Sequence, residues 1–143
     1  MYSTQCYTLF DCKTKGVDML IFKTKWFHKW AIREGISDRI LEKSITEMNQ
    51  GLIDANLGGN VYKKRIGLHG RGKSSSIRTI LAFKEGERAF FIYGFAKNER
   101  GNINEHEIKA LKAYARELLG YSNFALEKTI KTRILIKVNS NEP

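Results

Sequence analysis

The segment 77–96, IRTILAFKEGERAFFIYGFA, contains two strand-like stretches joined by a short turn. Residues 77–84 are mostly apolar and rich in β-branched and aromatic types, and residues 89–96 are apolar on both faces, as is typical of a central strand. The connection 85–87, Glu-Gly-Glu, is short enough for a hairpin. We therefore expect these two stretches to pair antiparallel and to form the middle of a sheet.

Three other segments have the composition of strands. They are 20–24, which is apolar at its start, 61–68 (VYKKRIGL), which alternates imperfectly between apolar and basic residues, and 133–138 (RILIKV). Pro143 is the only proline, so none interrupts these segments. The sheet is therefore expected to draw strands from both ends of the chain.

Helix boundaries are marked by capping residues. Apolar residues recur at helical spacing after Ser37, which is a suitable N-cap. A second helix is expected to begin after Asn104, because Glu107 three residues later completes a capping box, and to end at Gly120. Ser122 is expected to cap a short helix over 123–130. Together with the strands, these helices predict an α+β domain.

Composition limits the classes of protein to consider. The chain has 143 residues, 42% of them hydrophobic, which is enough for one domain with a real core. It holds 25 Lys and Arg against 15 Asp and Glu, a net charge of +10. No apolar run is long enough to cross a membrane and no secretory signal is evident, so we expect a cytoplasmic protein without a membrane partner. A basic excess of this size favours a polyanionic partner: nucleic acid, a ribosome or an acidic protein.

The two ends of the chain differ from its body. Residues 1–18 show no sustained period. Two interpretations are open: an appendage ahead of an alternative start at Met19, or an edge strand or ordered arm of the domain. Residues 139–143 are a polar tail, which leaves 19–138 as the domain. Cys6 and Cys12 lie in the first segment with no histidine nearby, so they do not complete a zinc site and no metal is expected.

The positive charge is concentrated in one stretch. Residues 55–84 contain no Asp or Glu but seven Lys and Arg, most of the net charge in about a fifth of the chain. A solvated surface usually mixes both signs, whereas this stretch has one sign only. Because it runs strand, glycine-rich loop, strand, we expect a basic sheet surface that binds phosphates. The alternative is a basic patch that serves solubility or docks an acidic protein.

Residues 67–74, GLHGRGKS, match the spelling of a phosphate-binding P-loop. A P-loop needs a helix directly after its Lys-Ser pair, because the helix N-terminus holds the phosphates. Here the following residues favour a strand, and no hydrophobic strand ending in Asp is present to hold magnesium. We therefore reject the match and interpret the glycines as a loop that lets Arg71 and Lys73 approach a phosphate backbone.

Within this basic region the sequence resembles a known family. The pieces GRGKS (70–74), IRTILAF (77–83) and FAKNER (95–100) occur in the order and at the spacing of the RelE/HigB-like toxins of type II toxin–antitoxin modules, in the RelE/ParE superfamily. The resemblance covers about 19–138. It implies a small, mostly antiparallel, curved sheet of about four to five strands with helices packed on one side.

The resemblance also implies an activity and partners. Such toxins are usually mRNA endoribonucleases that cut in the A site of the 70S ribosome, and a cognate antitoxin, often with a helix-turn-helix domain, blocks the active site. Cleavage uses the RNA 2′-hydroxyl as nucleophile, so neither metal nor cofactor is expected. Two alternatives stay open: a ParE-like toxin that acts on DNA gyrase without cutting RNA, and a degenerate toxin retained only as the antitoxin's partner.

By this resemblance the catalytic candidates are Arg71 and Lys73 in the basic loop, Arg78 in the following strand and Lys97 after the next strand. Arg78 is the strongest candidate, because a charge in an apolar strand is costly without an anionic ligand or partner, and a guanidinium suits a bidentate phosphate contact. Its alternative role is a structural salt bridge. The other basic residues of the region are the RNA-binding candidates: Lys63, Lys64, Arg65, His69 and Arg100.

The general base is open at this level. A lysine among other cations loses its proton more readily, which makes Lys73 a candidate, and Lys97 and His69 are the alternatives. The catalytic Tyr or His that some family members carry near the C-terminus has no counterpart in 133–143, RILIKVNSNEP. Tyr93 and Phe95 are expected to share a strand face with Lys97, where they either stack on an RNA base or pack in the core.

Overall fold

The computed structural model describes residues 19–67, 77–97 and 99–139. In chain order the elements are β1 (Leu20–Thr24), α1 (Lys25–Glu34), α2 (Asp38–Asn49), β2 (Ala55–Gly58), β3 (Val61–Ile66), β4 (Ile77–Lys84), β5 (Arg88–Ala96), α3 (Glu105–Leu119), α4 (Asn123–Lys131) and β6 (Leu135–Lys137). None of these four helices is both long and apolar enough to cross a membrane. The expectations for 1–18, for its two cysteines, for 69–73 and for most of the tail lie outside the described residues.

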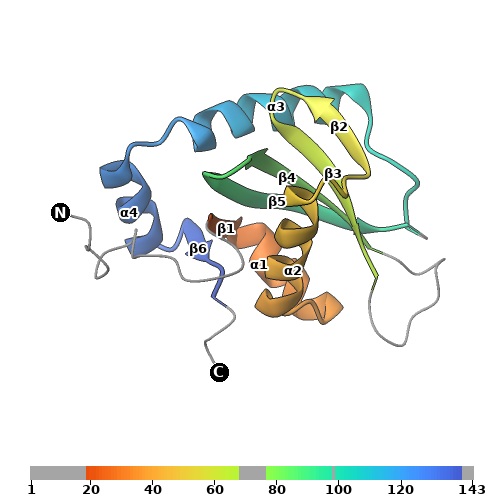
Figure 1. The fold of residues 1–143 in the computed structure, drawn as a ribbon, viewed down its shortest axis with the longest axis horizontal. Helices are drawn as coiled ribbons and strands as arrows, with labels where there is room; N and C mark the ends of the chain where they lie inside the picture. Colours follow the sequence, from red (N-terminus) through yellow and green to blue (C-terminus); the bar gives the residue numbers. More distant parts are fainter. Residues whose placement is uncertain (1–18, 68–76, 98, 140–143) are drawn as a thin grey trace.

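The strands form one mixed sheet in the order β2-β3-β4-β5-β1-β6 (Figure 1). Neighbouring strands are antiparallel except β1, which runs parallel to β5 with Leu20 opposite Arg88. The predicted α+β class and the mostly antiparallel sheet are confirmed. The described sheet has six strands rather than four to five, because the segment Ala55–Gly58 also pairs. Its sequence ANLG has low strand propensity, so composition did not reveal it.

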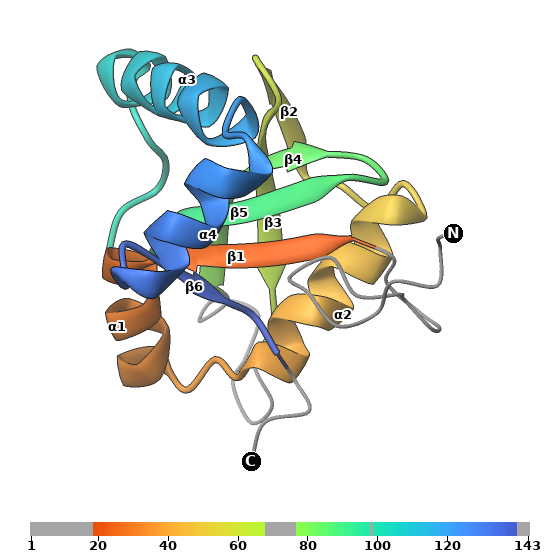
Figure 2. The ribbon, with the colours of Figure 1, turned by 90° about the vertical axis from the view of Figure 1, so that its left-hand side faces the viewer.

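Helices cover both faces of the sheet, which corrects the expectation that they pack on one side. Figures 1 and 2 show α1 and α2 on one face, with α3 and α4 on the other. The physical reason lies in β4 and β5, which present apolar side chains on both faces of the sheet. Leu81 and Phe91 are buried with α1 and α2, whereas Ile80 and Phe90 are buried with α3 and α4. A sheet whose centre is apolar on both faces needs two covering layers.

A bulge in β5 determines which of its side chains face α3. Tyr93 lies opposite Ile80 and Phe91 lies opposite Leu81, so Ile92 between them has no partner on β4. As a result Ile92 and Tyr93 both pack in the core under α3, and Phe95 follows on that same face. Gly94 faces the opposite layer, where an added Cβ would lie 2.2 Å from the Trp30 ring.

Three predicted helix starts are confirmed by the capping geometry. The Ser37 side chain accepts from the amide of Ile40 at the start of α2, and the Ser122 side chain caps α4. Asn104 and Glu107 form a complete capping box at the start of α3. Helix α1 begins directly after β1 because the Thr24 side chain caps it, accepting from the amide of Phe27 at 3.1 Å.

Candidate nucleic-acid interface

Three predicted cations lie in a row on one face of the sheet, formed by Lys63 and Arg65 of β3 and Arg78 of β4. In the antiparallel register, Arg65 lies opposite Arg78 and Lys63 opposite Ile80, and directly opposed residues share a face. Arg78 also lies opposite Phe95 on β5. Because Ile80 and Phe95 pack under α3, the row is on the α3 face. We call Lys63, Arg65 and Arg78 the cationic row.

The row is partly exposed and holds like charges close together. Arg65 is exposed, and Arg78 and Lys63 are half-buried. The carboxylate of Asp54 is 3.8 Å from Arg65, and the Lys63 ammonium donates to the neutral amide oxygen of Asn102 at 3.4 Å. Neighbouring cations on one partly exposed surface produce a positive potential that attracts anions. The row is therefore suited to a phosphate.

Of the other catalytic candidates, Lys97 borders the row. The segment that carries Arg71, Lys73 and His69 links the end of β3 to the start of β4, but these three residues lie outside the described part of the chain. Lys97 directly follows β5 and is exposed. Ala96, the last residue of β5, pairs with Ile77, the first residue of β4, so Lys97 lies near the start of β4, where Arg78 is the second residue. The structure thus brings Arg78 and Lys97 to one end of the sheet.

Lys64 occupies the opposite face, contrary to the expectation that it contacts RNA. It lies between Lys63 and Arg65 in an extended strand, so its side chain turns away from the cationic row. There it is only 6% exposed, and its ammonium pairs with Glu47 of α2 at 2.8 Å. A buried and paired ammonium is not available to a phosphate, so we assign Lys64 a structural role.

Arg100 also differs from the expected RNA contact. Its guanidinium binds both carboxylate oxygens of Glu107, at 2.9 and 2.5 Å, and lies 5.5 Å from the centre of the Phe95 ring. It also donates to the Tyr93 hydroxyl at 3.3 Å. The bonds from Arg100 and from the Asn104 amide lower the pKa of Glu107 to about 2. With its charge matched by Glu107, Arg100 anchors the connection between β5 and α3.

Aromatic side chains continue from the row toward α1. Tyr93 and Phe95 lie 6.1 Å apart between ring centres, and Trp26 stacks on Tyr93 at 4.9 Å. The shared face of Tyr93 and Phe95 agrees with the expectation for β5. Trp26 did not emerge from the sequence, because its place beside β5 depends on the capping of α1 by Thr24 and on the bulge at Ile92.

The comparison with protein families identifies the class. A model of the RelE toxin of the RelE/RelB toxin–antitoxin system matches residues 19–138. The chain therefore belongs to the RelE toxin family, and it is a toxin of a toxin–antitoxin system with a cognate antitoxin as partner. No curated protein matches the sequence. The resemblance stated from the basic region is thus confirmed over the predicted domain.

Proposed function

We propose that this protein is a ribosome-dependent mRNA endoribonuclease that inhibits translation. The observation that supports it is the cationic row, which lies at the end of the sheet where Lys97 follows β5. The family supports the same activity, because RelE toxins are generally endoribonucleases. The substrate in this proposal is mRNA in the A site of the 70S ribosome.

The proposed reaction uses the RNA as its own nucleophile. The 2′-hydroxyl attacks the adjacent phosphorus, the bond from phosphorus to the 5′-oxygen breaks, and a 2′,3′-cyclic phosphate and a free 5′-hydroxyl result. One proton leaves the 2′-hydroxyl and another reaches the 5′-oxygen, so a base and an acid are required. Lys73, Lys97 and His69 are the candidates for the base.

Arg78 has the central role in this mechanism. Negative charge grows on the phosphoryl oxygens in the transition state, and preorganised cations stabilise it. The Arg78 guanidinium supplies a planar, bidentate contact, and Lys97 adds charge from the end of β5. By the family resemblance, Arg71 and Lys73 contribute further positive charge. Lys63 and Arg65 hold the neighbouring backbone phosphates. In this proposal the residues of β3 bind the RNA backbone, and Arg78 of β4 and Lys97 after β5 act in the cleavage step.

The test compares two charge-removing variants of one strand. Arg78→Ala should lower the rate of mRNA cleavage on purified 70S ribosomes by about 100-fold or more, the usual cost of removing one transition-state donor. Lys84→Ala is the matched control, since Lys84 is an exposed cation at the other end of β4 that pairs with Glu87 at 3.6 Å. Cleavage is measured by mapping new mRNA 5′ ends, and circular dichroism checks the fold of each variant.

Each outcome has a distinct meaning. Equal cleavage by Arg78→Ala and the wild type would contradict the role of Arg78 while leaving the activity. Absence of cleavage by the wild type would contradict the activity itself. Inhibition of DNA gyrase supercoiling with mRNA left intact would instead support a ParE-like toxin.

A further inference from the structure

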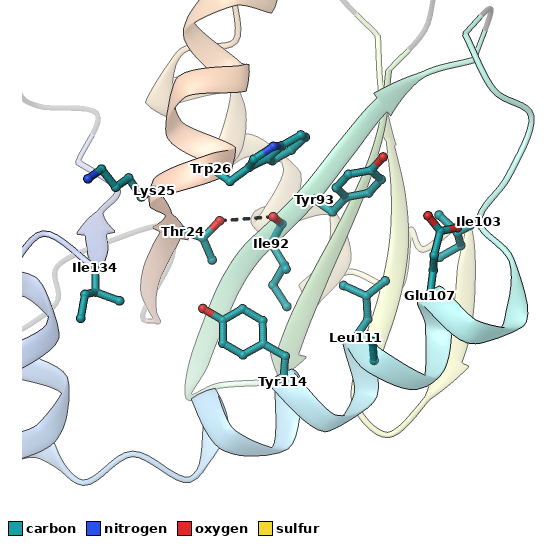
Figure 3. Close-up of a pocket in the computed structure, with 11 residues that line it drawn as sticks. Thr24, Lys25, Trp26, Ile92, Tyr93, Ile103, Glu107, Leu111, Tyr114 and Ile134 are labelled. Carbon is teal, nitrogen blue, oxygen red and sulfur yellow. Dashed lines mark hydrogen bonds between the residues drawn. The ribbon is translucent and has the colours of Figure 1, made fainter.

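A groove of about 560 Å³ lies beside the cationic row, between the start of α1, the bulge of β5 and helix α3 (Figure 3). Its floor is Ile92, the residue that the bulge adds to β5. Trp26 and Tyr93 line one side, and Leu111 and Tyr114 of α3 line the other. We call this space the aromatic groove. Its size is that of a small-molecule site rather than a packing defect.

Trp26 is placed to contact a ligand. Its ring stacks on Tyr93 with an interplanar angle of 26°, yet 46% of the residue is exposed. Trp30, one turn later in the same helix, is only 4% exposed. A large exposed aromatic surface next to a cavity is a common feature of binding sites.

Polar groups are few in the groove and positioned around its aromatic walls. The Tyr114 hydroxyl points into the groove (Figure 3), and among the described residues it has no hydrogen-bond partner. The Tyr93 hydroxyl accepts from Arg100 and retains its own proton to donate. The Thr24 hydroxyl is already used, because it donates to the Ile92 carbonyl at 3.2 Å. Two charged residues, Lys25 and Glu107, also line the groove, and the Glu107 carboxylate is bound by Arg100. Apart from these, flat apolar walls with two hydroxyls match the shape and edges of a nucleobase.

Tyr93 connects the groove to the cationic row. It lies two residues before Phe95 on the same face of β5, and Phe95 lies opposite Arg78. Two residues of an extended strand span about 7 Å. A phosphate bound at Arg78 therefore has one of its own or neighbouring bases within reach of the groove.

We propose that the aromatic groove binds one nucleobase of the RNA strand whose phosphates lie on the cationic row. This inference rests on the proposed RNA-cleaving function and adds a base subsite to it. Aromatic rings interleaved with cations are the usual arrangement for single-stranded RNA, whose bases stack on rings while cations follow the backbone. The exposed rings are Trp26 and the partly exposed Tyr93, whereas Phe95 is buried. The cations of the row, only two residues along β5 from Tyr93, favour RNA over a protein segment as occupant.

The test uses Trp26 as both variant and reporter. The chain has two tryptophans, and the other is buried, so quenching by a ligand reports on Trp26. The probe is a 2′-O-methyl A6 strand, which cannot be cleaved through the 2′-hydroxyl. The second probe is a fully abasic strand of equal length, which keeps the phosphates. A6 should quench the fluorescence of the wild type, whereas the abasic strand should bind without quenching it.

The affinities of the wild type and its variants for the labelled A6 and abasic strands separate the contribution of base stacking from that of phosphate binding. Trp26→Leu should bind A6 about 5- to 150-fold more weakly, the loss of one stacked base, and should bind the abasic strand as the wild type does. Trp26→Tyr, which retains a stacking ring, should recover most of the A6 affinity. Phe124→Leu is the matched control, because Phe124 is a 78% exposed aromatic residue on α4 outside the groove.

The possible failures are separable. If the wild type binds neither strand, the base subsite is refuted, whereas the proposed function is decided separately by the cleavage assay on 70S ribosomes. If Trp26→Leu and the wild type bind A6 equally, or if the variant loses affinity for both strands to the same extent, only the base subsite is refuted. If Trp26→Leu weakens binding of the co-expressed antitoxin and leaves A6 affinity unchanged, the groove is a protein-docking site and the proposal is overturned.

Discussion

Replacing Glu47 by alanine should destabilise the protein more than replacing its ion-pair partner Lys64 by methionine. The two charges are 2.8 Å apart, and their side chains are unequally exposed, 8% for Lys64 and 34% for Glu47. Glu47→Ala leaves a buried ammonium without a partner. Lys64→Met removes that charge, fills most of the same volume and leaves a carboxylate that water reaches.

The expected magnitudes follow from this asymmetry. Removing one partner of a fully buried pair costs about 3–5 kcal/mol, and an exposed pair is worth about 0–1 kcal/mol. With one side chain buried and the other one-third exposed, Glu47→Ala should cost about 2–3 kcal/mol. Lys64→Met should stay within about 1 kcal/mol of the wild type, because apolar replacement of a buried charge is often neutral.

The measurement is urea unfolding followed by circular dichroism, with equal m-values as the check that free energies are comparable. RNA affinity is measured in parallel. Lys64→Met should retain the RNA affinity. Lys63→Met and Arg65→Met should each weaken it, and each should reduce the slope of log affinity against log salt concentration by about one, the loss of one phosphate contact. The structural assignment of Lys64 is refuted if Lys64→Met is as destabilising as Glu47→Ala, or if it weakens RNA binding as much as Lys63→Met.

Two further perturbations test the packing and the electrostatics around the site. Gly94→Ala should cost about 3 kcal/mol in unfolding free energy, because the new Cβ would lie 2.2 Å from the Trp30 ring. Combining it with Trp30→Leu should recover part of that loss, and simple additivity would contradict the contact. Glu107 has its pKa lowered from 4.5 to about 2 by Arg100 and by the Asn104 amide, so its stabilising effect is present above pH 4.5 and is lost as the pH falls toward 2. Glu107→Gln should therefore lower Tm at pH 7 and match the wild type near pH 2, and a constant difference across this range would count against the ion pair.

Features set by neighbouring residues were predictable from the sequence. The N-caps Ser37, Asn104 and Ser122 were predicted because a cap and the amide it binds are three residues apart. The hairpin of β4 and β5 was predicted for a similar reason, since its turn spans three residues. Such signals do not depend on the rest of the fold.

Long-range features could not be predicted in the same way. The parallel pairing of Leu20 with Arg88 leaves no local signal in either segment. The apolar character of β4 and β5 on both faces indicated burial, but it did not show that two separate helical layers would provide it. The bulge at Ile92 exists only in the register with β4.

In the candidate site, too, local features could be predicted from the sequence and long-range contacts could not. The basic cluster led to one predicted role, RNA binding, for Lys63, Lys64 and Arg65 alike. Strand alternation contains the signal that separates Lys64 from the other two, because its side chain must face the opposite side of the sheet. The partners that complete the assignment came from elsewhere. Glu47 reaches Lys64 from another helix, and Glu107 reaches Arg100 once the connection after β5 folds back on α3.

The parallel pairing of β1 with β5 also has a consequence for synthesis of the chain. Strand β1 has no partner on its β5 side until residues 88–91 have been made, and its other neighbour, β6, comes later still. Because the chain is synthesised from the N-terminus, neither hydrophobic layer is complete before those residues, and the aromatic groove also needs Ile134. A protein built in this way completes its site only late in its own translation, so an unfinished chain still attached to a ribosome does not yet carry the assembled site.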